Sequence, residues 1–141
     1  MDVATTQPRL VEVDTVHDAR GTLSFIESPK LPFAVQRLYY FYDFPSGGEG
    51  VERGLHGHLK LETMMLCVAG RFRVRVRHKG VDHDFVLDRP NLALHIPPMS
   101  WRRVHDFAPG SVGIVLASRK YEREDYVFEY DEWLKIEAGA R

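Results

Sequence analysis

Short segments of alternating apolar and polar residues run along most of this chain and predict β-strands. In residues 71–77, for example, Phe72, Val74 and Val76 alternate with four arginines. Many short strands without intervening helices predict an all-β sandwich or barrel. Only residues 122–135, rich in acidic and aromatic side chains, predict one or two turns of helix. We expect strands at residues 23–26, 33–41, 55–68, 71–77, 83–87, 92–96, 103–107 and 112–117, separated by turns rich in glycine and proline.

The length and charge of the chain narrow its possible partners. A chain of 141 residues is expected to form one domain. Its 19 basic and 20 acidic residues nearly cancel, so we expect neither nucleic acid nor an anionic membrane as a partner. The single cysteine, Cys67, lies in an apolar run, which predicts a buried thiol and no disulfide framework. No apolar stretch reaches the ~20 residues of a membrane span, and residues 1–8 lack a signal-peptide pattern, so we expect a soluble, cytoplasmic protein.

Two histidines one residue apart, His56 and His58, form the strongest chemical signal. On a strand both imidazoles lie on the same face, and a regular strand would add Lys60 and Glu62 to that face. Because the flanking sequence is apolar, we expect this face to line a polar cavity and not to face solvent. The pair is suited to binding a metal or to moving protons. Where a small β-barrel metalloprotein would present a third histidine, this chain has Arg102, so we expect no metal.

Proton transfer needs a donor to stabilise the anion that forms. A neutral imidazole with a pKa near 6.5 can remove a proton from carbon next to a carbonyl if a nearby donor holds the enolate oxygen. Alternation in residues 33–42 places Arg37 and Tyr39 on the more apolar, interior face, with Tyr40 and Tyr42 opposite. We therefore favour Tyr39 and Arg37, over Tyr40, as cavity-lining residues. Ordinary core packing of the tyrosines remains the alternative.

Arginines at the ends of predicted elements suggest an anionic ligand. Arg20, Arg53 and Arg102 each lie where a forked donor can reach a phosphate or a sugar oxygen. The four arginines of residues 71–77 are a different case. They fit either a phosphate-binding stripe or the solvated outer face of a half-buried strand, and the second interpretation is favoured.

Several segments, in matching order, resemble the WxcM/FdtA-type family of sugar-nucleotide 3,4-ketoisomerases over about residues 20–134. The resemblance implies a cupin fold, a jelly-roll barrel with a short C-terminal helical segment, in a single domain of residues 1–141. It also implies no cofactor, no metal, and a homodimer with exchanged N-terminal strands. The segments that carry the resemblance are residues 20–27, 31–40, 53–58, 92–101, 115–118 and 121–126.

The implied reaction converts a dTDP-4-keto-6-deoxyglucose to its 3-keto isomer, which an aminotransferase then converts to a 3-amino sugar. The family's two active-site histidines match His56 and His58, and its aromatic-strand tyrosine matches Tyr39 or Tyr40. Its two Arg-Gly pairs match Arg20 and Arg53. One histidine removes the C3 proton next to the carbonyl, an enediol forms, and protonation at C4 leaves the ketone at C3.

The chain departs from the family at three positions near the site. Leu59 and Thr63 stand where the family typically has lysine and glutamine, and Arg102 stands where some members have histidine. Leu59 is expected to point away from the histidines. The other two departures leave the substrate and the C4 configuration of the product open.

Two functions remain as alternatives to a 3,4-ketoisomerase. Residues 50–56 are similar to the segment around the catalytic histidine of the related 3,5-epimerases. A cupin that binds a sugar nucleotide, or a metal through His56, His58 and Glu62, without turnover is the non-enzymatic alternative.

Overall fold

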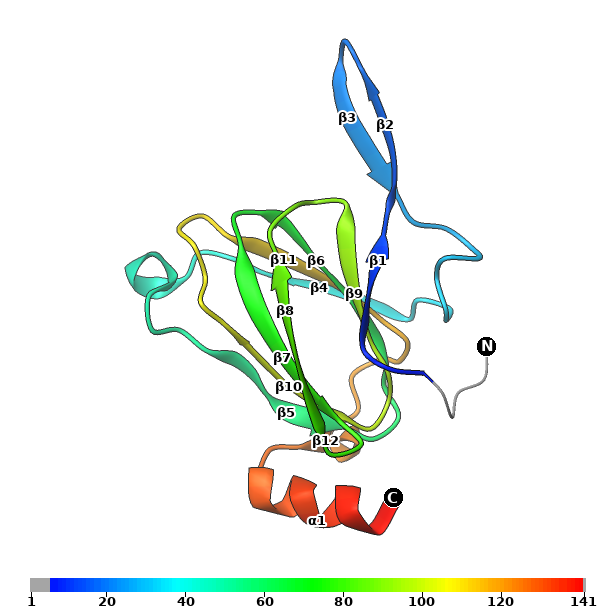
Figure 1. The fold of residues 1–141 in the computed structure, drawn as a ribbon, viewed down its shortest axis with the longest axis vertical. Helices are drawn as coiled ribbons and strands as arrows, with labels where there is room; N and C mark the ends of the chain where they lie inside the picture. Colours follow the sequence, from blue (N-terminus) through cyan, green and yellow to red (C-terminus); the bar gives the residue numbers. More distant parts are fainter. Residues whose placement is uncertain (1–5, 141) are drawn as a thin grey trace.

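Two five-stranded antiparallel sheets pack face to face (Figure 1). The structure is a computed structural model that describes residues 6–140; residues 1–5 and 141 of the expected domain lie outside the described residues. This jelly-roll arrangement confirms the expected all-β cupin fold. One sheet has the order β1 (Arg9–Glu12), β9 (Leu92–Ile96), β6 (Thr63–Ala69), β11 (Val112–Ala117), β4 (Arg37–Phe41). The other has the order β12 (Tyr126–Val127), β5 (Arg53–His58), β10 (Ser100–His105), β7 (Phe72–His78), β8 (Val81–Leu87).

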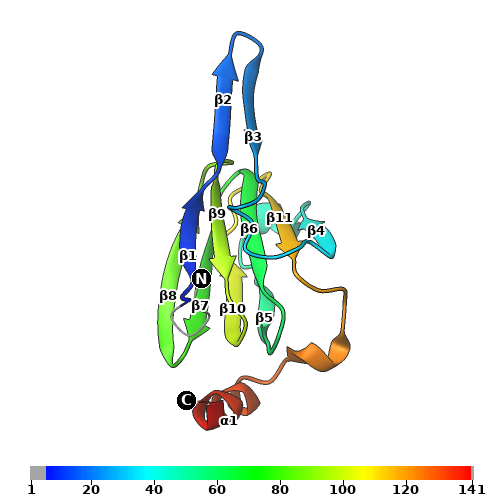
Figure 2. The ribbon, with the colours of Figure 1, turned by 90° about the vertical axis from the view of Figure 1, so that its right-hand side faces the viewer.

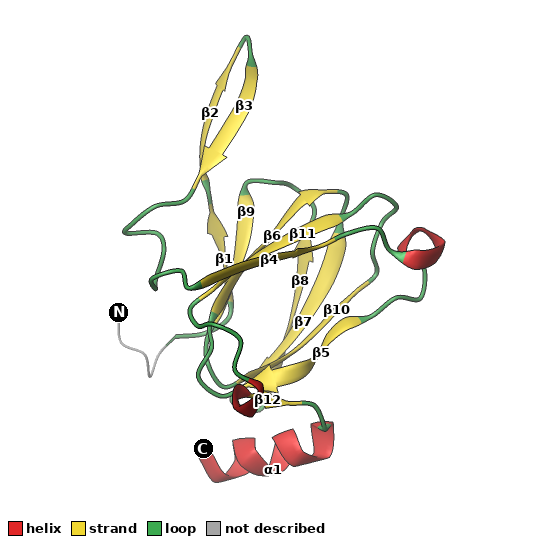
Figure 3. Ribbon diagram, turned by 180° about the vertical axis from the view of Figure 1, so that it is seen from behind, coloured by secondary structure: helices red, strands yellow, loops and turns green. Residues whose placement is uncertain are grey.

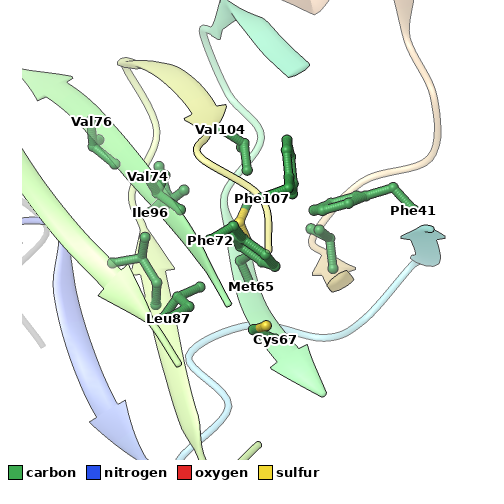
Figure 4. Close-up of a cluster of buried hydrophobic side chains, with 12 residues drawn as sticks. Phe41, Met65, Cys67, Phe72, Val74, Val76, Leu87, Ile96, Val104 and Phe107 are labelled. Carbon is green, nitrogen blue, oxygen red and sulfur yellow. The ribbon is translucent and has the colours of Figure 1, made fainter. Parts of the chain in front are cut away.

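The hydrophobic core lies between the two sheets (Figure 4). Alternation along β7 places Phe72, Val74 and Val76 in this core, each 0% exposed. The ring of Phe72 packs against that of Phe41 at 5.6 Å between centroids. Cys67 is buried and unpaired as expected, and burial raises the pKa of its thiol to about 11.

The arginines of β7 point outward and form ion pairs. Arg75 Nε lies 2.8 Å from Asp84 Oδ1, and Arg77 Nη2 lies 2.9 Å from Glu137 Oε1. These guanidinium groups are thus already paired with carboxylates of the same chain. This face is therefore the solvated outer side of a strand and not a phosphate-binding stripe.

A two-stranded hairpin, β2 (Asp14–Asp18) and β3 (Gly21–Phe25), projects from the body of the molecule (Figures 1 and 2). The sequence predicted a strand at residues 23–26 but missed β1 and β2. No residue of β1 or β2 is fully buried, so neither strand has a buried apolar face of the kind that alternation detects.

The predicted strand at residues 55–68 is interrupted by a turn. β5 ends at His58 and β6 begins at Thr63. Asp125 holds the turn, because its carboxylate accepts hydrogen bonds from the backbone N–H groups of Lys60 and Leu61 at 2.7 and 3.0 Å. The prediction that Lys60 and Glu62 share the histidine face was therefore wrong, since a turn ends the alternation. Glu62 Oε2 instead lies 2.8 Å from His95 Nε2.

Two further element boundaries differ from expectation. The strand predicted at residues 33–41 begins only at Arg37. The C-terminal helix α1 (Tyr130–Ala140) lies under β5 and β12 (Figure 3) and is longer and later than the turns predicted at residues 122–135. Trp133 explains its position: its indole is fully buried against Gly57, where a Cβ atom would lie only 2.4 Å from the ring. No helix within residues 6–140 is long and apolar enough to cross a membrane.

Candidate active site

The two histidines of β5 contact each other directly. The Nε2 atoms of His56 and His58 are 3.0 Å apart, and the two rings meet edge to face. His58 is 1% exposed. The alternation of β5 thus produces the shared face that the sequence predicted, on the inner side of the sheet.

A carboxylate continues this hydrogen-bond chain. Asp125 Oδ2 lies 3.3 Å from His58 Nδ1. A carboxylate only accepts, so His58 donates a hydrogen bond from Nδ1–H, and its Nε2 accepts a hydrogen bond from His56 Nε2–H. This assignment, made from the hydrogen bonds, leaves His56 Nδ1 without a proton and able to act as a base.

Burial keeps both imidazoles neutral. Desolvation, followed by the positive charges of Arg102 and Arg37, lowers the pKa of His56 to about 3. The same desolvation, with Arg102 next, lowers the pKa of His58 to about 2. The site therefore holds two neutral histidines beside cationic side chains.

A cavity opens on one side of His56. Tyr39, Arg53, His56 and Arg102 are among its lining residues. Tyr39 is half-buried, and desolvation raises the pKa of its phenol, which keeps it a hydrogen-bond donor. Tyr40 instead is 59% exposed and lies on the other side of the strand. His58 does not line this cavity and lies behind His56.

Arg37 lies beside the cavity and not in its lining. Its guanidinium group donates to the hydroxyl of Tyr126 at 3.3 Å and lies 5.0 Å from the ring centre of Tyr39. The ring of Tyr126 in turn packs on His58 at 4.2 Å between centroids. Arg37 therefore links the aromatic side chains around the histidine pair.

Arg102 is directly opposite His56 in the antiparallel pairing of β10 with β5. Its side chain is 1% exposed, and Nη1 donates to the Oγ1 atom of Thr63 at 2.9 Å. Its Nε and Nη2 atoms are buried without a hydrogen-bond partner. Thr63 and Arg102, two of the positions at which the resemblance suggested a difference, thus contact each other.

Arg20 is not brought to this cavity within one chain. It lies at the turn of the β2–β3 hairpin, fully exposed, and pairs with Asp18 at 2.8 Å. Glu62 is also separate from the histidines, because its carboxylate binds His95. No group of three or more His, Cys, Asp and Glu side chains in residues 6–140 is arranged to hold a metal ion.

Asp125 and Tyr126 are the site residues to which the sequence reading gave no role. They lie 67 and 68 positions after His58: Asp125 ends the turn that precedes β12, and Tyr126 is the first residue of β12. No spacing rule links them to the histidines. The only available signal was their place in the segment at residues 121–126 that resembles the family.

Comparison with known proteins decides the family. The family described as FdtA: WxcM-like, C-terminal matches residues 6–138. The chain belongs to this family. The WxcM-like chain is 36% identical over 128 residues to the TDP-4-oxo-6-deoxy-alpha-D-glucose-3,4-oxoisomerase of Aneurinibacillus thermoaerophilus, which covers 90% of each protein.

Solved structures agree with this assignment. A 3,4-ketoisomerase from Helicobacter canadensis has a TM-score of 0.87 and 31% identity, covering 93% of this chain and 97% of that chain. A mutant of the 3,4-ketoisomerase QdtA from Thermoanaerobacterium thermosaccharolyticum, in complex with TDP-4-keto-6-deoxyglucose, also has a TM-score of 0.87. It is 29% identical and covers 94% of each chain.

Proposed function

We propose that this WxcM-like protein is a sugar-nucleotide 3,4-ketoisomerase that converts a dTDP-4-keto-6-deoxyhexose to its 3-keto isomer, a step in deoxyamino-sugar biosynthesis. The observation that carries the proposal is the neutral, buried His56–His58 pair opposite the buried guanidinium of Arg102. This arrangement suits a reaction that moves a proton and forms an anion on oxygen. The activities named for the similar proteins support the same substrate class.

His56 is the proposed base, because it lines the cavity whereas His58 lies behind it. His56 Nδ1 removes the C3 proton of the 4-keto sugar, and the electron pair of the C–H bond forms the C3–C4 double bond. The C4 oxygen becomes the anion of an enediolate. Transfer of the proton from the C3 hydroxyl to the C4 oxygen, followed by protonation of C4, leaves a ketone at C3 and a hydroxyl at C4.

His58 and Asp125 support this base. When His56 takes the proton, the positive charge is shared along a hydrogen-bond chain that ends at a carboxylate. That carboxylate favours the imidazolium form, which desolvation and Arg102 disfavour. An anionic diphosphate bound at Arg53 would add further compensation.

The remaining side chains bind or polarise the substrate. Tyr39 is a neutral phenol in the cavity, suited to shuttling the proton between the two oxygens. Arg53 is exposed at the mouth, where its charge suits the diphosphate. Arg37, beside the cavity, donates to the hydroxyl of Tyr126 and lies over the ring of Tyr39, so its charge acts on the substrate through these side chains.

Incubation with dTDP-4-keto-6-deoxyglucose in deuterated water tests the proposal. Deuterium at C4 of a 3-keto product is the expected result, detected by NMR. Exchange at C3 and C5 with epimerisation would instead support the related 3,5-epimerase function. No exchange above the buffer blank would contradict both enzymatic functions and leave sugar-nucleotide binding alone.

The proposed assembly is a homodimer with exchanged N-terminal strands. The β2–β3 hairpin supports it, because it projects from the body and exposes Val16 and Leu23. In such a dimer Arg20 would reach the partner's cavity, which its own chain does not allow. A cytoplasmic location remains our proposal, consistent with the single unpaired Cys67.

A further inference from the structure

Arg102 is a buried guanidinium group that forms no direct ion pair with a carboxylate in residues 6–140. Within residues 6–140 no acidic side chain forms an ion pair with it, and its single hydrogen bond goes from Nη1 to the hydroxyl of Thr63. Burying a charge costs free energy unless an opposite charge or hydrogen bonds compensate it. The arrangement therefore indicates a binding role for the two remaining donor atoms, Nε and Nη2.

These two donors form one edge of the guanidinium plane. The Nε–H bond and one Nη2–H bond of an arginine run parallel, and this edge binds two neighbouring oxygens of a planar group. The hydroxyl of Thr63 accepts a hydrogen bond from Nη1, which lies in the same plane but away from this edge. One hydrogen bond thus fixes the plane and leaves the two-donor edge free.

The enediolate of the proposed reaction has the matching shape. Its C3–C4 double bond lies within the sugar ring, so both oxygens lie side by side in one plane. In the starting 4-keto sugar the C3 hydroxyl is on a tetrahedral carbon and leaves that plane. A planar pair of donors therefore binds the intermediate better than the substrate, which is the requirement for catalysis.

We propose that the Nε–Nη2 edge of Arg102 binds both O3 and O4 of the enediolate, and that Thr63 is the positioning residue that orients this edge. The inference rests on the proposed isomerase function and deepens it. The register of β10 with β5 supports it, because it puts Arg102 directly opposite His56, the proposed base. Both side chains line the same cavity.

Thr63 is well placed for this task. It is the first residue of β6 and is 0% exposed. A branched β-carbon restricts the rotation of its hydroxyl, so the acceptor has a fixed position. Its side chain is short, which leaves room beside it for the long buried side chain of Arg102.

Exchanging Thr63 tests the positioning role. Thr63→Val keeps the shape and removes the acceptor, and we expect kcat to fall by about 10-fold or more with KM within about twofold, since the lost contact acts on the intermediate. Thr63→Ser restores the acceptor and should recover kcat to within about threefold of wild type. The control is Ser111→Ala, which also removes a fully buried hydroxyl but one that binds only backbone; its kcat should not change.

Arg102→Lys tests the two-donor edge and does not depend on Thr63→Val folding. It keeps the positive charge and loses the planar edge, so kcat should fall by about 100-fold or more. A lysine variant with a third or more of the wild-type kcat would show that charge alone suffices and would overturn the proposal. So would a folded Thr63→Val enzyme with wild-type kcat, or a KM effect without a kcat effect. Absence of the 3-keto product with the wild-type protein would instead contradict the proposed function itself.

Discussion

At the scale of single residues, the site depends on three groups that act in series. His56 lies in the cavity, His58 contacts it from behind, and Asp125 accepts from His58. Each group fixes the protonation of the next. The hydrogen-bond chain therefore sets the tautomer of His56 from a carboxylate that does not line the cavity.

Replacing that carboxylate should slow the reaction. In Asp125→Asn the amide can no longer stabilise the protonated pair, and we expect kcat to fall by about 100-fold, with a smaller effect on KM. Steady-state kinetics with the dTDP-4-keto sugar measures this. Asp131→Asn, on the exposed side of α1, is the matched control. A folded Asp125→Asn enzyme with wild-type kcat would remove Asp125 from the mechanism.

The neutral histidines should also make stability depend on pH. Their pKa values are lowered in the folded protein, so below about pH 6.5 the unfolded chain binds protons that the folded chain does not. The free energy of unfolding should therefore fall as the pH falls, by about 1.4 kcal/mol per histidine between pH 7.5 and 5.5.

Urea unfolding at the two pH values measures this loss. The double variant His56→Asn/His58→Asn should lose the share of the difference that this pair contributes and keep the share of His78 and His105, whose pKa values burial also lowers. His83→Asn, half-buried on β8, should keep the full difference. An equal pH dependence in the wild type and the double variant would show that the pair does not titrate as described.

At the scale of elements, the sequence located the strands that supply the core and missed β1 and β2, which have no fully buried residue. β7 and β9 contribute side chains to the core, and their positions were predicted closely. The turn at residues 59–62 was missed because Asp125, distant in sequence, holds it through backbone hydrogen bonds. The spacing of His56 and His58 and the alternation around Tyr39 identified these site residues, and the family resemblance agreed with them, whereas the contacts of Asp125 and Thr63 are visible only in three dimensions.

The contact between α1 and β5 makes a specific stability prediction. Gly57→Ala would place a Cβ atom 2.4 Å from the ring of Trp133, so the ring or the strand must shift, at a cost of about 1–3 kcal/mol. Gly139→Ala in the same helix meets nothing within 4 Å and should be neutral or slightly stabilising. Denaturant unfolding compares the two variants. Equal stabilities would show that this contact is looser than described.

At the scale of the whole molecule, the β2–β3 hairpin is the part that packs against neither sheet of its own chain. β2 and β3 pair only with each other and extend away from both sheets (Figure 2). Their exposed apolar residues and Arg20 gain a role if the hairpin lies on a second copy. The cavity of each chain would then be complete only in the dimer.

Mixed dimers test this link. Arg20→Ala and His56→Asn should each be nearly inactive alone, because each damages every cavity. If Arg20 acts in the partner's cavity, a mixed dimer of the two variants has one damaged and one intact site. Mixing after unfolding and refolding should then recover up to about a quarter of the wild-type activity, since half of the dimers are mixed. A monomer by light scattering, or no recovery in a mixture shown to contain mixed dimers, would contradict the exchange.

The packing of Trp133 has one more consequence. Both tryptophans of the chain, Trp101 and Trp133, lie in one buried cluster against the outer side of β5, with their rings 6.2 Å apart. Gly57, on which Trp133 rests, lies between His56 and His58. The chain therefore contains an intrinsic fluorophore next to its reactive pair, and emission from these indoles should report ligand binding at the cavity without any added label.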